Sequence, residues 1–154
     1  MNNLKLSPGN IVILVAGAVI LVASFLPFYD VPTIGDIDVD FETGEVEVSG
    51  GGDSVNAWNP DWGFPVTTLP AVLGAAMAVV VGLTAFANVR LPERVMGFSW
   101  NQIHLLAGAQ TAIMMLAFLI ADSPDKGIGF WLMLLASIGL VVGAVLRERE
   151  PAAA

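Results

Sequence analysis

Cysteine is absent from this chain of 154 residues, and charged residues are scarce. Without cysteine the protein forms no disulfide, holds no metal through thiolates and is not acylated as a lipoprotein. Charged residues make up 13% of the chain, whereas an average globular protein has about 25%. The six basic residues are scattered along the sequence, so no basic patch indicates a nucleic-acid partner.

The chain also lacks the residue patterns of common active sites. It has a single histidine, His104, and none of the HExxH, P-loop or GxSxG motifs. No cluster of ligating residues predicts a cofactor or a resident metal. We therefore expect a protein that is not an enzyme.

Apolar residues dominate what is present, with 56% hydrophobic residues and a mean hydropathy of +0.77. A helix that crosses a bilayer needs about 20 mostly apolar residues. Four segments meet this requirement, at about 7–29, 64–87, 99–121 and 128–146. The expected fold is all-α, a four-transmembrane-helix bundle forming one membrane domain over residues 1–154. A cleaved signal peptide is the competing interpretation of the first segment, but its apolar run is long for one.

The basic residues predict how these segments are oriented. With four spans, one side of the membrane has only one basic residue, Lys126. The remaining five lie on the other side: Lys5, Arg90, Arg94, Arg147 and Arg149. Basic residues favour the cytoplasmic side. We therefore expect a multi-pass protein of the plasma membrane with both termini in the cytoplasm. Residues 30–63 then form an outer loop.

The outer loop contains the stretch "DIDVDFETGEVEV", in which apolar and acidic residues alternate. Alternation with period two predicts a β-hairpin over residues 36–49, with Thr43-Gly44 as its turn. In that register Val39 stands opposite Val48. Six acidic residues share one face: Asp36, Asp38, Asp40, Glu42, Glu45 and Glu47. The apolar face needs to be covered, and we expect the helix ends, the rest of the loop or a partner to cover it. The following stretch "SGGGDS" is expected to be a flexible segment that returns the chain toward the second span.

Three interpretations of the acidic face remain open. It is a solvated face that blocks edge pairing, a docking surface for a basic partner, or a cation site. The spacing of Asp36, Asp38, Asp40 and Glu47 resembles a calcium loop, but Phe41 occupies the position that needs glycine. An EF-hand is therefore not expected, and only a weak surface calcium site is left open.

Small residues recur at four-residue spacing inside the spans, as in helices that pack closely in lipid. The pairs and triplets are Gly74, Ala78 and Gly82, then Gly108 and Ala112, then Gly139 and Gly143. We expect packing within the chain, with a homo-oligomer contact as the alternative. His104 and Gln110 are the intramembrane polar residues of the third span. We expect Gln110 to form an interhelical hydrogen bond and His104 to lie near the inner interface, and a proton or ligand site is the competing interpretation.

Proline interrupts the first two spans near their outer ends, at Pro27 and Pro70. The outer end of the bundle is therefore expected to be wider than the inner end. A shallow cleft there, holding a lipid tail or a partner's helix, would be lined by aromatic residues: Phe28, Tyr29, Trp58, Trp62 and Phe64.

Two stretches carry a resemblance, "SFLPFYDV" at the end of the first span and "NAWNPDWGFP" before the second. They resemble small actinobacterial membrane proteins of unassigned function, which share four predicted spans, an aromatic-proline exit from the first span and a tryptophan before the second. That family brings no known active residues. The layout is also similar in shape to claudins, but this sequence lacks their paired loop cysteines and W-GLW-C-C pattern.

The leading functional hypothesis is a non-catalytic accessory, scaffold or assembly subunit. It would contact another membrane or extracytoplasmic protein through its outer loop and helix faces. The alternative is a lipid-binding or transport-related protein that uses the outer cleft together with His104 and Gln110.

Overall fold

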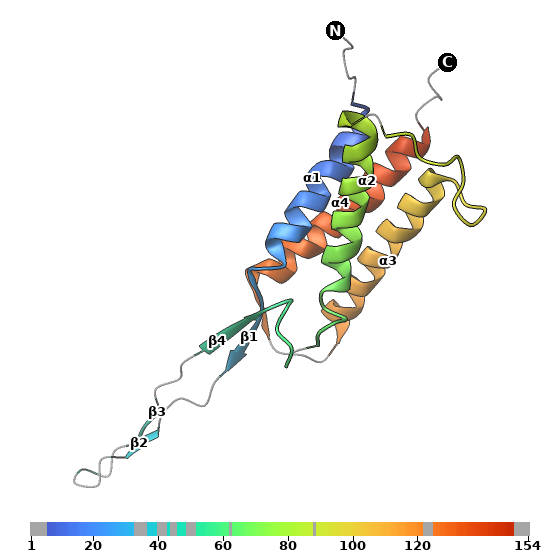
Figure 1. Cartoon of the computed structure of the whole chain (residues 1–154). Helices are drawn as coiled ribbons and strands as arrows, with labels where there is room; N and C mark the ends of the chain where they lie inside the picture. The colour runs from blue at the N-terminus through green and yellow to red at the C-terminus, as the bar shows by residue number, and fades with distance from the viewer. Residues whose placement is uncertain are drawn as a thin grey trace.

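The computed structural model describes residues 6–32, 37–39, 43, 46–48, 52–61, 63–87, 89–121 and 125–149. Helices α1 (Pro8–Ala23), α2 (Leu69–Phe86), α3 (Trp100–Ile120) and α4 (Ile128–Arg149) lie side by side as a bundle (Figure 1). Helix α1 packs between α2 and α4, and α3 packs against α4 and α2. The first turn of α1 and the last turn of α4 lie at one end of the bundle, and the strands lie at the other.

Three of these helices, α2, α3 and α4, are long and apolar enough to cross a membrane, whereas α1 is apolar but has 16 residues. The expected span 7–29 is thus only partly helical. Helix α1 ends at Ala23, and the chain becomes a strand at Pro27, which has no N–H to continue the helical hydrogen bonds. Helix α2 is also shorter than the expected span 64–87, because residues 63–68 form turns before the helix begins.

Pro70 marks the start of the second helix and does not kink it. It occupies the first turn of α2, where a missing N–H costs no intrahelical hydrogen bond. Helix α3 begins after Ser99, which forms a capping box with Gln102. The bounds of α3 agree with the expected span 99–121, and α4 extends three residues beyond the expected end at 146.

Small residues let the helices approach closely within the chain. A Cβ atom added at Gly17 of α1 would lie 2.5 Å from the carbonyl oxygen of Gly74 in α2. One added at Gly108 of α3 would lie 3.3 Å from the backbone of Leu140 in α4, and one at Gly143 would lie 2.8 Å from the side chain of Ile13. The expectation that Gly74, Gly108 and Gly143 pack inside the chain agrees with these contacts, and Gly17 joins them although the spacing pattern did not include it.

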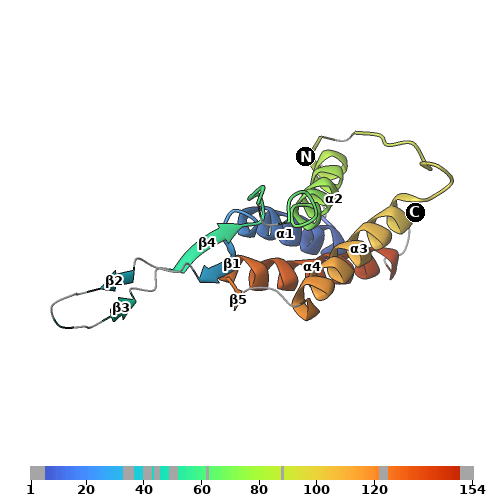
Figure 2. The same ribbon diagram turned by 90° about the horizontal axis from the view of Figure 1, so that it is seen from below.

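A three-stranded antiparallel sheet closes the strand-bearing end of the bundle. Its order is β4 (Gly52–Asn56), β1 (Pro27–Pro32), β5 (Asp125–Lys126). Figure 2 shows β5 beside β1 at the start of α4. The sheet joins the connection between α1 and α2 to the connection between α3 and α4, because β5 belongs to the latter. The expectation that "SGGGDS" is a flexible return is wrong for its last residues, since β4 begins at Gly52.

The expected hairpin is present as β2 (Ile37–Val39) and β3 (Val46–Val48), but its register differs. Val39 stands opposite Val46 and Ile37 opposite Val48, a shift of two residues that keeps the same residues on each face. A two-residue Thr-Gly turn requires positive φ at a β-branched threonine, which is unfavourable, so a longer connection is the better solution. Residues 40–42, 44 and 45 lie outside the described residues.

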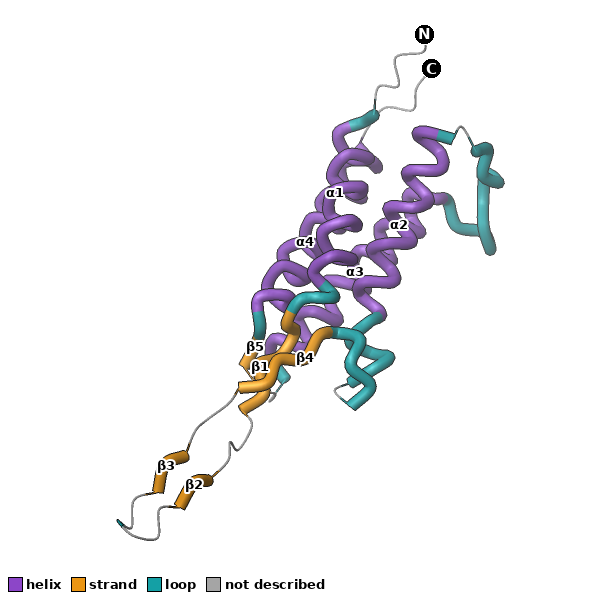
Figure 3. The backbone as a smooth tube through the Cα atoms, turned by 60° about the vertical axis from the view of Figure 1, so that its left-hand side comes forward, coloured by secondary structure: helices purple, strands orange, loops and turns teal. Residues whose placement is uncertain are grey.

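The hairpin does not lie over the helix ends as expected. Figures 1 and 3 show β2 and β3 beyond β1 and β4, directed away from the four helices. The two strand pairs are successive parts of one excursion of the chain between α1 and α2. We call this excursion, residues 27–56, the ribbon.

Candidate functional site

The ribbon is attached to the bundle through Ser24, a buried residue at the end of α1. The indole Nε1 of Trp58 donates a hydrogen bond to Ser24 Oγ at 2.9 Å, and that hydroxyl donates to the carbonyl of Leu21 at 2.6 Å. The Phe25 ring stacks on the Trp58 indole with centroids 5.5 Å apart. The backbone N–H of Ala57 also donates to the carbonyl of Ser24 at 3.2 Å. The end of β4 is therefore fixed to the end of α1.

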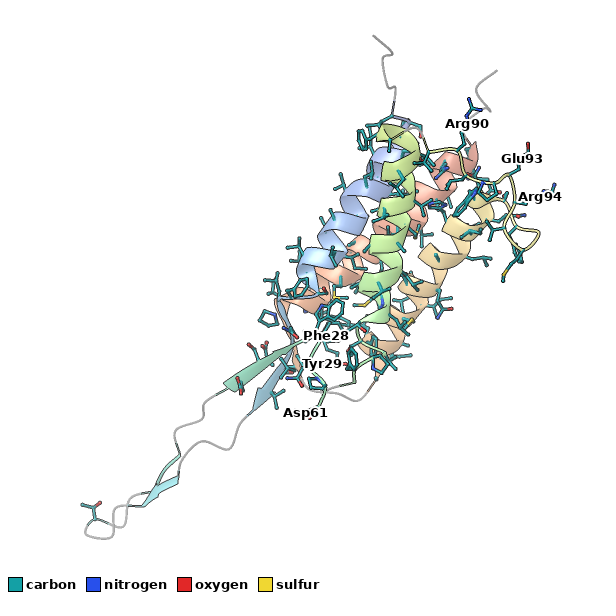
Figure 4. All side chains as sticks on the ribbon, viewed as in Figure 1. Phe28, Tyr29, Asp61, Arg90, Glu93 and Arg94 are labelled. Atoms are coloured by element: carbon teal, nitrogen blue, oxygen red, sulfur yellow. The ribbon has the colours of Figure 1, made fainter. Side chains whose placement is uncertain are left out.

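Phe28 forms the centre of an aromatic cluster under the sheet. Its ring is fully buried and meets three others edge to face, with centroid distances of 4.8 Å to Tyr29, 5.8 Å to Phe118 and 5.4 Å to Phe130. These rings come from β1, α3 and α4, so one residue of the ribbon joins three elements. Figure 4 shows Phe28 and Tyr29 where the strands meet the helices.

The four described residues among the five aromatics expected to line an outer cleft do not converge on one. Phe28 and Tyr29 are buried in the core, at 0% and 6% exposure, and thus do not line an open surface. Trp58 is half-buried at the attachment point, Phe64 is 50% exposed, and Trp62 lies outside the described residues.

Gly127 and Gly129, at the start of α4, pack against the end of α1 and the start of β1. The N–H of Gly127 donates to the carbonyl of Phe28 at 3.0 Å. A Cβ atom at Gly129 would lie 2.7 Å from the carbonyl oxygen of Ala23 and 2.8 Å from that of Leu26. The Lys126 ammonium lies 5.8 Å from the centre of the Tyr29 ring, within range of a cation–π interaction. The first turn of α4 thus supports the base of the ribbon.

Acidic residues stand opposite one another along the ribbon. Asp38 pairs with Glu47 in β2–β3, and Asp30 pairs with Asp125 in β1–β5. Like charges in opposite positions weaken a sheet. Of the other expected partner-binding residues, Asp36, Asp40, Glu42 and Glu45 lie outside the described residues. Within the described ranges, no group of three or more histidine, cysteine or acidic residues is arranged to hold a metal ion.

A groove of about 250 Å³ lies between α2 and α3, along the first eight residues of α3 and the middle of α2. Its wall is apolar except for one imidazole and one indole. The lining residues are Leu73, Ala76, Met77, Val80, Trp100, Ile103, His104 and Ala107. We call it the α2–α3 groove.

His104 is 1% exposed and forms part of this wall. Its Nδ1 atom lies 2.6 Å from the carbonyl oxygen of Trp100, and because a carbonyl only accepts, Nδ1 carries the hydrogen. Its Nε2 atom is buried and has no hydrogen-bond partner among the described residues. An unpartnered buried nitrogen is unusual, since most buried polar atoms have a hydrogen-bond partner.

Gln110 is not brought together with His104. It is exposed on the outer surface of α3, whereas His104 faces α2. No hydrogen bond of the Gln110 side chain to another described residue is present, so the expected interhelical bond is not formed. A separation of six residues turns a helix by about 240°, which places the two side chains on different faces.

The loop between α2 and α3 borders the α2–α3 groove and was not singled out from the sequence. Trp100 Nε1 donates to the carbonyl of Pro92 at 2.8 Å, which ties the loop to the start of α3. Val95 and Phe98 exchange backbone hydrogen bonds of 3.0 Å across a two-residue turn, with Met96 at φ 52° and Gly97 at φ 86°. The Met-Gly pair was the only local signal for this turn, and it is weaker than Asn-Gly.

The same loop carries exposed Arg90, Glu93 and Arg94. Figure 4 shows Arg94 directed sideways from the bundle and all three at the end away from Phe28 and Tyr29.

Comparison of the chain with protein-family models, curated proteins and solved structures finds no match. The resemblance carried by residues 24–31 and 56–65 therefore stays a prediction. What the structure adds is a physical role for those residues, because Ser24, Phe28 and Trp58 attach the ribbon to the helices.

Proposed function

We propose that this protein is a non-catalytic accessory or assembly subunit of the plasma membrane, which presents the acidic ribbon to a basic partner outside the membrane. The observation that carries the proposal is the geometry of the ribbon. Its base is part of the sheet that closes the bundle, and its far strands, β2 and β3, are directed away from the helices (Figure 3).

The attachment of the ribbon supports a presenting role. An isolated two-stranded hairpin is marginally stable in water, and opposed acidic residues weaken it further. Here β1 is paired on both sides, by β4 and β5, and Phe28 is buried among rings of two helices. A firm base with an acidic far end suits a surface that meets a positively charged partner, since complementary charge accelerates and orients association.

The membrane location and orientation have a direct test, because the chain has no cysteine of its own. A single cysteine at Asp53 of β4 should react with a membrane-impermeant maleimide in intact cells, and one at Glu93 should react only after permeabilisation. Both positions are exposed. The expected contrast follows from the excess of basic residues at the end that carries Glu93. Equal labelling of both cysteines in intact cells would contradict the orientation.

Neutralising the far end of the ribbon tests the partner hypothesis. The variant Asp38→Asn, Asp40→Asn, Glu45→Gln, Glu47→Gln is expected to reduce co-purification of the partner by about fourfold or more, since four surface charge pairs worth roughly 0.2–1 kcal/mol each are lost. The measurement is a crosslinked pulldown from native membranes in mild detergent, quantified by mass spectrometry.

The matched control removes the same number of charges from the outer side but leaves the far end of the ribbon intact. It carries Asp30→Asn, Asp53→Asn, Asp61→Asn and Asp125→Asn, all at exposed positions. Partner recovery should stay near the wild-type level. An equal loss in both variants would show that overall negative charge, rather than the ribbon, attracts the partner.

Lipid binding is the alternative function, and the feature that favours it is the α2–α3 groove, not the expected outer cleft. The outer aromatic residues do not form a cleft, but the α2–α3 groove offers about 250 Å³ beside the buried His104.

A further inference from the structure

The α2–α3 groove runs along the helices toward the arginine-bearing loop. From Trp100 to Ala107 it extends about 10 Å along α3, at 1.5 Å per residue. Trp100 is the first residue of α3, and the loop enters α3 there. Ala76, which lines the groove on α2, is exposed, so the groove is open at the side of the bundle.

The loop at this end supplies positive charge. Arg90 and Arg94 are exposed, and Glu93 offsets only one of the two charges. The hydrogen bond from Trp100 to the carbonyl of Pro92 holds the intervening backbone against the first residue of the groove. Guanidinium groups match phosphate geometry, since two parallel N–H groups reach two oxygens. The loop that carries the two guanidinium groups is thus tied to Trp100, a residue of the groove wall.

We infer that the α2–α3 groove binds one acyl chain of an anionic glycerophospholipid from the inner leaflet, whose phosphate headgroup is held by Arg90 and Arg94. The inference rests on the proposed membrane location and orientation, but not on the acidic ribbon. The apolar wall suits a hydrocarbon chain, and the charge of the loop complements an anionic headgroup. Trp100 stands where the two parts of such a lipid meet, a depth at which indoles are favoured.

A second groove provides an internal comparison. It lies between α1 and α4, has a volume of about 270 Å³ and is lined only by aliphatic side chains: Ala18, Val19, Val22, Ala23, Leu26 and Leu132. It lies in the half of the bundle nearer the ribbon, where the loops contain no arginine. It therefore offers the same kind of apolar space without guanidinium groups.

The test is native mass spectrometry of the full chain, purified in mild detergent and equilibrated with equal amounts of phosphatidylglycerol and phosphatidylcholine. The wild type is expected to retain one phospholipid and to prefer phosphatidylglycerol by roughly fivefold for each arginine, the factor for a basic residue near an anionic surface. The variant R90Q/R94Q should bind both lipids equally. Ala76→Leu should lower the retention of both lipids, and Ala18→Leu, which fills the second groove, should leave it unchanged.

Two results would overturn the inference. One is equal retention of the two lipids by the wild type. The other is equal loss of lipid in Ala76→Leu and Ala18→Leu, which would indicate lipid bound without a site. Arg90 and Arg94 are exposed loop residues, so R90Q/R94Q tests the headgroup contact even where Ala76→Leu disturbs folding. Failure of the ribbon variants to lose a partner would leave this result unaffected.

Discussion

Replacing Gly17 with alanine is expected to destabilise the bundle by about 1–3 kcal/mol, the usual cost of overpacking. The added Cβ atom would lie 2.5 Å from the carbonyl oxygen of Gly74 and 2.6 Å from the Cβ atom of Ala78. A backbone oxygen cannot move away by a side-chain rotation, so α1 and α2 must separate along their contact. In lipid this separation is costly, because close packing is a main force that holds helices together there.

The matched control for this prediction is the same substitution at Gly82 of α2. A Cβ atom there would meet only the side chain of Leu14, at 3.8 Å, which is ordinary van der Waals contact. Because alanine favours a helix over glycine by up to about 1 kcal/mol, Gly82→Ala should be neutral or slightly stabilising. The measurement is the Tm of each variant in detergent. A Gly17→Ala variant as stable as Gly82→Ala would contradict the close contact between α1 and α2.

The second large effect is expected from Phe28→Ala, with a loss of about 3–5 kcal/mol, the range for removing a buried phenyl ring. The ring is fully buried and supports three edge-to-face contacts, so its removal leaves a cavity between β1, α3 and α4. The base of the ribbon would lose its main anchor. Recovery of a partner by the ribbon should fall together with the Tm.

Phe64→Ala is the control for Phe28→Ala, because the sequence assigns both rings to the same expected cleft. Phe64 is 50% exposed, and its truncation should change the free energy of unfolding by less than about 0.5 kcal/mol. Thermal unfolding of the two variants in the same detergent compares them directly. Similar small losses in both would show that Phe28 lies at a surface, and the structural role of the cluster would be wrong.

Local patterns in the sequence were sufficient to predict the helices and the hairpin, because each of these elements is formed by residues close together in the chain. Long apolar runs predicted α2, α3 and α4, since a 20-residue apolar segment has few other stable forms. Alternation with period two predicted a hairpin within residues 36–49, and its faces survived the shift in register. Four-residue spacing of small residues predicted close helix packing, which Gly108 and Gly143 illustrate.

These local patterns could not predict the contacts between segments that are far apart in the chain. The strand β5 has two residues, too few for any period, and it exists because β1 offers it an edge. Phe28 and Tyr29 were interpreted as surface residues, because an aromatic pair at the end of an apolar run looks the same whether it lies at an interface or under a sheet. Gln110 was expected to form an interhelical hydrogen bond, but its side chain is exposed. The sequence sets the depth of such a residue in the span, whereas the neighbouring helices decide which side of the helix is covered.

The sequence by itself therefore determined that this chain is a bundle of apolar helices with an acidic hairpin at one end. These features follow from hydropathy and periodicity, which act over one element at a time. Only the tertiary structure decided that the ribbon is anchored on one side and directed away from the helices. It also placed a groove between α2 and α3 whose wall is tied to the arginine-bearing loop at Trp100. The pairing of elements far apart in the chain depends on which surfaces fit together when all of them are packed at once.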